Sequence, residues 1–110
     1  MRSAATSRVA LEALALIEKN KMQSLSPAGI AEQLECSRQF ADRCLSAVCG
    51  KTLSKAIEDA RMEEARRRLQ DGCSIADIVK TMQYTSANQF YRIYKRHFGH
   101  TTKMLLTTNS

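Results

Sequence analysis

The second half of this 110-residue chain repeats the pattern of the first half. At an offset of 49, five positions carry identical or similar residues: Ser37 and Ser86, Arg43 and Arg92, Leu45 and Tyr94, Gly50 and Gly99, and Thr52 and Thr101. Just before them, an offset of 48 pairs Ala28 with Ala76, Ile30 with Ile78, Ala31 with Val79, and Leu34 with Met82. The change of offset indicates one extra residue in the turn of the second copy. Nine pairs in register constrain the chain to two copies of one folding unit.

Each copy has the signals of a short helix, a tight turn, a serine-capped longer helix and a glycine stop. Serine accepts hydrogen bonds from the free N–H groups at a helix start, and glycine suits the residue after its end. The capping serines and the stop glycines are Ser26, Ser37, Ser74, Ser86, Gly50 and Gly99. The longer helices are predicted at about residues 37–48 and 86–98. This layout is that of a helix-turn-helix, whose second helix can enter a major groove.

The remaining sequence is also predicted to be helical. The apolar stretch Val9–Ile17 indicates a largely buried helix, and the apolar stripe of Leu53–Leu69 predicts a long one. Residues 101–106 suggest a last short helix. We therefore expect an all-α fold of about seven helices, with two helix-turn-helix subdomains joined by a long central helix. The predicted segments are residues 7–52, 53–69 and 70–106.

The second helix of each copy has an apolar face and a polar face. The polar faces carry Arg38, Gln39, Asp42, Arg43 and Ser46 in the first copy, and Asn88, Tyr91, Arg92, Lys95 and Arg96 in the second. Arginine can donate two hydrogen bonds to guanine, asparagine or glutamine can pair with adenine, and lysine or arginine can neutralise phosphate. One such face alone is more often a solvated surface, whereas two matching faces in tandem favour duplex DNA as the partner.

Composition supports the same partner. The net charge is +6, and residues 51–110 carry eleven Lys and Arg against six Asp and Glu, which favours a polyanion. No apolar stretch reaches membrane-spanning length and no targeting segment is recognisable, so we expect a cytoplasmic protein. Lacking C-x-x-C spacing, the cysteines are interpreted as reduced thiols: Cys36, Cys44, Cys49 and Cys73. We expect no metal, cofactor, small-molecule pocket or enzymatic activity, since no catalytic motif is present.

Three stretches are typical of one family of regulators. They are Ser86–Gly99 in the second copy, Arg61–Leu69 in the central helix and Ser74–Ile78 after it. Positions that match in the first copy are Ala31, Leu34, Ser37, Arg43, Gly50, Lys51 and Leu53. In these motifs the chain resembles the AraC/XylS family of bacterial transcription regulators over nearly its whole length.

This resemblance implies a transcription regulator that binds double-stranded DNA sequence-specifically, with its two recognition helices in successive major grooves. The base contacts that it implies are Gln39, Asp42, Arg43, Ala87, Asn88, Tyr91 and Arg92. The expected DNA backbone contacts are Ser37, Arg38, Lys51, Thr52, Ser86, Lys95, Arg96, His100 and Thr101. A central helix of ~17 residues spans ~25 Å, and half of each flanking unit brings this near the ~34 Å turn of B-DNA. We expect a monomer on DNA, unless a domain outside this chain dimerises it.

The chain departs from the family pattern at several positions. Family turns usually have glycine where this chain has Glu35 and Gln83, so a left-handed backbone there should cost roughly 1–2 kcal/mol. The first copy has Ala41 and Leu45 where the family has larger side chains, which predicts a thin core. Asp42 can accept from cytosine, but its charge opposes phosphate. We therefore expect the first unit to contribute less sequence information.

The sequence leaves one other function open. A small helical bundle could bind a protein, such as RNA polymerase or another regulator, with weak or vestigial DNA contacts. Salt dependence separates the two hypotheses, because DNA binding through several phosphates weakens steeply as salt rises. RNA polymerase is also a candidate partner of the DNA-bound protein. The chain is interpreted either as a standalone regulator or as a fragment of a longer one.

Overall fold

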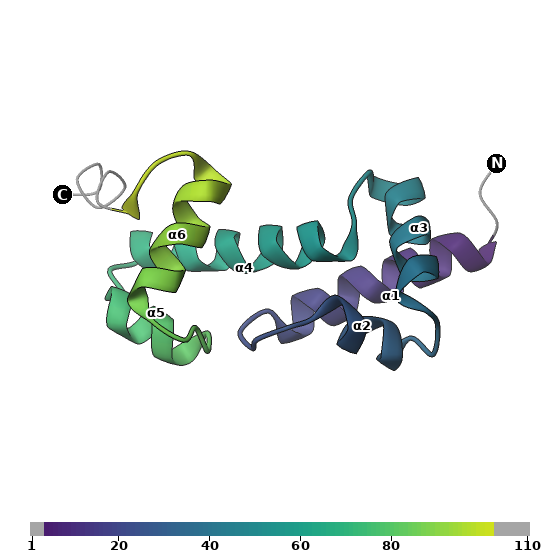
Figure 1. Cartoon of the computed structure of the whole chain (residues 1–110), viewed down its shortest axis with the longest axis horizontal. Coiled ribbons are helices and arrows are strands. Elements are labelled where there is room, and N and C mark those ends of the chain that lie inside the picture. Colours follow the sequence, from purple (N-terminus) through teal and green to yellow (C-terminus); the bar gives the residue numbers. More distant parts are fainter. Residues whose placement is uncertain (1–3, 103–110) are drawn as a thin grey trace. The chain divides into compact units, whose positions relative to one another are not determined.

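The computed structural model describes residues 4–102, and six α-helices form this part of the chain (Figure 1). They are α1 (Ala4–Asn20), α2 (Pro27–Gln33), α3 (Arg38–Cys49), α4 (Leu53–Gln70), α5 (Ile75–Thr81) and α6 (Ala87–Phe98). The predicted all-α class is confirmed. Of the predicted seventh helix, residues 103–106 lie outside the described residues.

The helix starts follow the predicted serine caps. Four serines have extended φ and ψ angles, and each hydroxyl accepts a hydrogen bond from the N–H three residues later: Ser26, Ser37, Ser74 and Ser86. Gly50 and Gly99 follow α3 and α6 with φ angles of 71° and 78°, which glycine adopts without steric cost. Because these signals are local, α3 and α6 lie within one residue of their predicted bounds.

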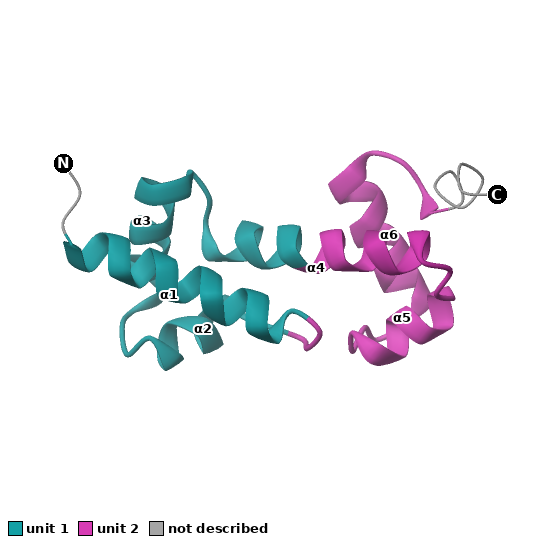
Figure 2. Ribbon diagram, turned by 180° about the vertical axis from the view of Figure 1, so that it is seen from behind, with its two compact units in different colours: residues 1–21, 25–60 teal, residues 22–24, 61–110 magenta. Residues whose placement is uncertain are grey.

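The chain divides into two compact units, which Figure 2 shows in different colours. Unit 1 comprises Met1–Lys21 and Leu25–Ala60, and unit 2 comprises Met22–Ser24 and Arg61–Ser110. The first part of α4 therefore belongs with α1–α3, and the second part belongs with α5 and α6. The segments predicted from sequence, residues 7–52, 53–69 and 70–106, stay a prediction.

Unit 1 is built around small side chains. Helix α1 packs against α3, and Ala10, Ala13 and Ala41 are completely buried. Small side chains allow two helices to approach closely. The larger members of this core include Ile17 and Leu45. The core also contains Ile30, Leu53 and Ile57, so the thin core expected for the first copy stays a prediction.

Unit 2 is built around aromatic and long apolar side chains. Phe90 and Tyr94 of α6 are completely buried, with ring centroids 5.8 Å apart, and the ring of Tyr84 lies 5.3 Å from that of Phe90. Burial raises the pKa of Tyr94. Among the described residues, its hydroxyl has no hydrogen-bond partner. The core of unit 2 therefore depends on a few large rings, whereas that of unit 1 depends on many small contacts.

Two further properties bear on function. No helix in the described part of the chain is long and apolar enough to cross a membrane. Over residues 4–102, no group of three or more His, Cys, Asp and Glu side chains could hold a metal ion. The four cysteines are free thiols, and burial raises the pKa of Cys36.

Candidate nucleic-acid interface

The two units present their longer helices from equivalent turns. Glu35 and Gln83 have φ angles of 58° and 61°, so the left-handed turn expected at both positions is confirmed. Ser37 and Ser86 then each accept a backbone N–H hydrogen bond at 3.1 Å. These caps use only the hydroxyl oxygen as an acceptor. Each hydroxyl hydrogen can still be donated to a phosphate oxygen.

The outward face of α6 is polar and basic. Its exposed residues are Ala87, Asn88, Tyr91, Arg92, Lys95 and Arg96. Within the described part of the chain, the side chains of Arg92 and Lys95 form no hydrogen bond or ion pair. Their cationic groups can therefore meet an external anion without breaking an intramolecular contact.

The residues that follow α6 extend this face. A hollow beside the helix is lined by Tyr91, Arg92, Lys95, Thr101 and Thr102. The His100 ring lies 5.9 Å from that of Tyr94, and its Nδ1 is 3.1 Å from the carbonyl oxygen of Thr101. Thr102, which is not among the predicted site residues, is only 5% exposed. The repeat could have predicted this burial, because the offset of 49 pairs Thr102 with the buried Leu53.

The corresponding face of α3 is partly engaged within the protein. Asp42 is half-buried, and its Oδ1 accepts a hydrogen bond from the N–H of Leu53, the first residue of α4, at 2.7 Å. Its Oδ2 lies 3.8 Å from Nε of Arg38, whose Nη2 donates to Oγ of Ser54 at 3.3 Å. Asp42 and Arg38 therefore connect α3 to the start of α4. Local sequence reasoning misses this role, since the bonded residues are 11 and 16 positions apart.

The residues after α3 are engaged in the same way. Lys51 Nζ lies 2.7 Å from Oδ2 of Asp59, and Thr52 Oγ1 accepts from the N–H of Lys55 at 3.2 Å. The hydrogen bond to Asp59 raises the pKa of Lys51. Burial acts to raise the pKa of Asp59, but hydrogen bonds from Lys51 and Lys55 outweigh it and lower that pKa. The predicted backbone contacts Lys51 and Thr52 thus already have partners in unit 1.

Each unit therefore has its own candidate surface. In unit 1 the exposed part of α3 carries Arg38, Gln39 and Arg43 beside Phe40, which is 37% exposed and was not predicted. In unit 2 the exposed part of α6 brings Tyr91 together with Arg92 and Lys95. Both surfaces place an arginine and an aromatic ring in the N-terminal half of a helix, which is where helix-turn-helix proteins contact base edges.

Comparison with known proteins agrees with this geometry. A family model described as a helix-turn-helix domain matches residues 30–107. The C-terminal domain of AraT, a response regulator from Geobacillus stearothermophilus, has a similar fold, with a TM-score of 0.86 and 22% identity over 96% of this chain and 88% of that one.

A second solved structure is similar over almost its whole length. It is a transcriptional regulator from Chromobacterium violaceum, described as an AraC-type DNA-binding domain-containing protein, with a TM-score of 0.81 and 28% identity over 98% of this chain and 97% of that one. No curated protein sequence matches the chain. The chain belongs to the AraC-type family of helix-turn-helix transcription regulators.

Proposed function

We propose that the chain binds double-stranded DNA sequence-specifically and that α6 supplies most of the recognition. The observation that carries the proposal is the exposed face of α6. Asn88 can pair with adenine, Arg92 can donate two hydrogen bonds to guanine, and the ring of Tyr91 can contact a thymine methyl group. Lys95 follows one turn later, where it can neutralise a phosphate. Because Arg92 and Lys95 have no partner within the described residues, binding breaks no ion pair of theirs.

Unit 1 would read a second major groove with fewer contacts. Gln39 and Arg43 are exposed on α3 and can reach base edges, whereas one oxygen of Asp42 is held by α4. The DNA backbone contacts that we propose lie around the two helices: Ser37, Arg38, Lys51, Thr52, Ser86, Lys95, Arg96, His100 and Thr101. The description of the Chromobacterium violaceum protein as containing an AraC-type DNA-binding domain supports this function.

Selection of bound duplexes from a random DNA pool tests the proposal. We expect two short motifs about one helical turn apart, with the motif read by α6 the more strongly enriched. Binding to the selected duplex should weaken steeply as salt rises, because each phosphate contact releases counterions. If no duplex is enriched at low salt, the proposal is wrong.

A charge-matched pair of variants separates a specific surface from general basicity. The double variant Arg92→Gln/Lys95→Gln should weaken DNA binding. It should also reduce the slope of log affinity against log salt concentration by about one unit, because one phosphate contact is lost. The control Arg8→Gln/Lys19→Gln removes the same charge from exposed positions of α1. Equal effects of the two double variants would indicate nonspecific attraction instead.

One observation favours a protein partner as the alternative. A largely apolar hollow between α1 and α2 is lined by Glu12, Ala15, Leu16, Lys19, Gln33 and Leu34. A complex through this surface, for example with RNA polymerase, should resist salt. Salt-resistant binding to a protein, together with no enriched duplex, would replace the DNA-binding proposal with this one.

A further inference from the structure

Arg61 is a buried cation in unit 2 that donates to two backbone carbonyls. It lies in α4 and is 7% exposed. Its Nη1 donates to the carbonyl oxygen of Gln23, and its Nη2 donates to that of Met82 at 2.7 Å. The guanidinium also lies 4.7 Å from the centroid of the Tyr84 ring. A guanidinium suits this arrangement, because its several donors are held in a fixed planar geometry and can reach two separate carbonyls at once.

The three residues Met22–Ser24 are part of unit 2, although they follow α1 in the sequence (Figure 2). Met22 packs against the core of unit 2. The N–H of Ser24 donates to Oε1 of Gln83 at 3.0 Å. The segment is therefore joined to the turn of the second helix-turn-helix at two successive residues, through Arg61 to Met82 and directly to Gln83.

This turn is strained and determines where α6 begins. Gln83 has a φ angle of 61°, which is sterically unfavourable for a residue other than glycine. Three residues later Ser86 caps α6. Glu35, at the equivalent turn of unit 1, has no side-chain hydrogen bond or ion pair within the described residues. The connection is thus specific to unit 2, where the side chains of Arg92 and Lys95 form no hydrogen bond or ion pair within the described residues.

We propose that Met22–Ser24 braces the second helix-turn-helix, and that Arg61 is a positioning residue that sets the base preference of α6 through this brace. The inference rests on the proposed DNA-binding function. It assigns a role in DNA selection to a loop that is not among the proposed DNA contacts. Its two parts, the brace and its effect on base preference, are tested separately.

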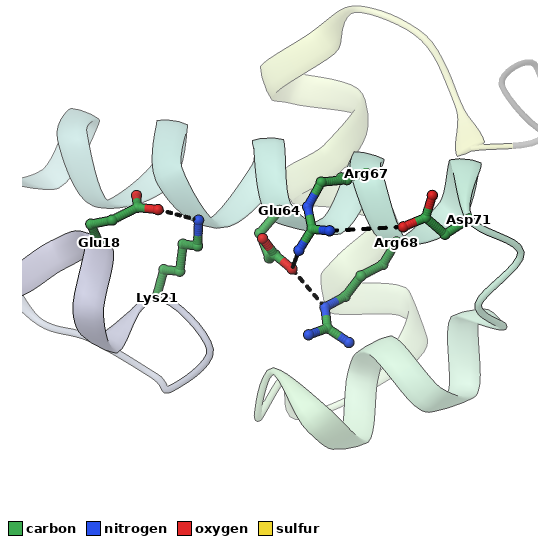
Figure 3. Close-up of polar contacts among 6 residues, drawn as sticks. All are labelled: Glu18, Lys21, Glu64, Arg67, Arg68 and Asp71. Atoms are coloured by element: carbon green, nitrogen blue, oxygen red, sulfur yellow. Dashed lines mark hydrogen bonds and ion pairs between the residues drawn. The ribbon is translucent and has the colours of Figure 1, made fainter.

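The first experiment uses the full chain without DNA. Amide hydrogen exchange is compared in wild type, Arg61→Met and Arg67→Met. Arg67 is the matched control because its side chain is 62% exposed and pairs with Glu64 of the same helix and with Asp71 just after it (Figure 3). In Arg61→Met, the amides of Ser24 and Tyr84 should exchange about tenfold faster, since the hydrogen bonds that hold the turn are lost. If these amides exchange in Arg61→Met at the wild-type rate, the proposed brace is wrong.

A milder variant keeps the test valid if Arg61→Met does not fold. Gln83 is exposed, and Gln83→Met removes only the acceptor of the Ser24 N–H. Faster exchange at Ser24, with the amides of unit 1 unchanged, supports the brace. Unchanged exchange at Ser24 contradicts it.

The second experiment measures affinity for the selected duplex and for duplexes with one altered base pair in either half-site. One mismatched base pair typically weakens binding roughly tenfold. In Arg61→Met, the loss of affinity caused by a mismatch in the half-site read by α6 should become much smaller or disappear. Discrimination at the half-site read by α3 should not change. Arg61→Lys should restore it at most in part, because a lysine ammonium lacks the fixed planar arrangement of donors that a guanidinium has.

The outcomes separate the brace from the proposed function. A uniform loss at both half-sites, or full rescue by Arg61→Lys, would overturn the positioning role. If wild type binds no duplex, the proposed function fails, and with it the role of Arg61 in base preference. The exchange measurements then decide the brace by themselves.

Discussion

Helices α3 and α6 begin at the same kind of turn and the same serine cap, but they use equivalent positions differently. In unit 1, Asp42 of α3 accepts from the first N–H of α4. In unit 2, the equivalent residue is Tyr91, which is 42% exposed. Beside it, Arg92 and Lys95 have no side-chain partner within the described residues. One helix is anchored by its polar face, whereas the other leaves that face available.

This difference shows that the repeat preserves the backbone but not the use of side chains. Helix α3 is anchored at its polar face as well as by buried residues such as Ala41 and Leu45, whereas α6 is held from its apolar face by the buried rings of Phe90 and Tyr94. A helix held from its core side can keep its outer residues for binding. We therefore expect stability to depend on polar contacts more in unit 1 and on aromatic packing more in unit 2.

The largest effect is expected where the two cores differ most. Phe90 and Ala41 are equivalent by the offset of 49, and both are completely buried. Phe90→Ala should lower the free energy of unfolding of unit 2 by about 3–5 kcal/mol, because a large buried ring leaves a cavity. Urea unfolding followed by tyrosine fluorescence measures this, since all three tyrosines lie in unit 2. Phe40→Ala, at a partly exposed ring in unit 1, is the control and should leave that transition unchanged. A loss below 1 kcal/mol would remove the contrast between the cores.

The next effect concerns DNA and compares Arg92 with Arg43. Arg92→Ala should weaken binding to the selected duplex by about 1–3 kcal/mol and relax the preference at one base position. Arg43→Ala should have a smaller effect, because α3 is expected to contribute less to recognition. Titration of both variants against the same set of duplexes at one salt concentration measures the difference. If Arg43→Ala weakens binding more than Arg92→Ala does, α3 and not α6 supplies most of the recognition.

Asp42 and Tyr91 provide the sharpest comparison of the two faces. Asp42→Ala removes the acceptor for the N–H of Leu53 and should destabilise unit 1 by about 0.5–2 kcal/mol, as loss of a helix cap does. Tyr91→Ala should change stability by less than about 0.5 kcal/mol but weaken DNA binding. Denaturant unfolding and DNA titration of each variant distinguish the two roles. If Asp42→Ala is as stable as wild type and binds DNA less selectively, Asp42 is mainly a base contact.

These residues also show which features could be predicted from sequence. The caps at Ser37 and Ser86 depend on neighbouring residues only, so the helices they begin are predictable. The left-handed turns at Glu35 and Gln83 follow from the resemblance to a family that has glycine there. The hydrogen bond of Arg61 to Gln23 joins residues 38 positions apart, and the bond of Asp42 to Leu53 depends on how α3 lies against α4. Such contacts depend on tertiary packing, which local patterns do not encode.

Glycine at the two turns should stabilise the units unequally. Glu35→Gly relieves a left-handed backbone without losing a side-chain contact and should raise the free energy of unfolding of unit 1 by about 1 kcal/mol. Gln83→Gly relieves the same strain but loses the acceptor of the Ser24 N–H, so its net gain should be smaller. Urea unfolding followed by circular dichroism, with tyrosine fluorescence assigning the unit 2 transition, gives both values. An equal gain at the two positions would mean that the hydrogen bond to Ser24 contributes nothing.

The smallest effect is a pH dependence confined to unit 1. Hydrogen bonds from Lys51 and Lys55 lower the pKa of Asp59 in the folded state. A carboxyl group with a lowered pKa stabilises the fold fully above its unfolded pKa, which is near 3.8, and this contribution is lost as the pH falls through the folded value. Because Lys51 is 42% exposed, the contribution should be below about 1 kcal/mol. Asp59→Asn should therefore destabilise unit 1 slightly at pH 7 and converge with wild type under acid conditions. In unit 2 the position equivalent to Lys51 is His100, not a lysine. Asp59→Asn should therefore leave the unfolding transition of unit 2 unchanged. A change in that transition would mean that the ion pair acts beyond unit 1.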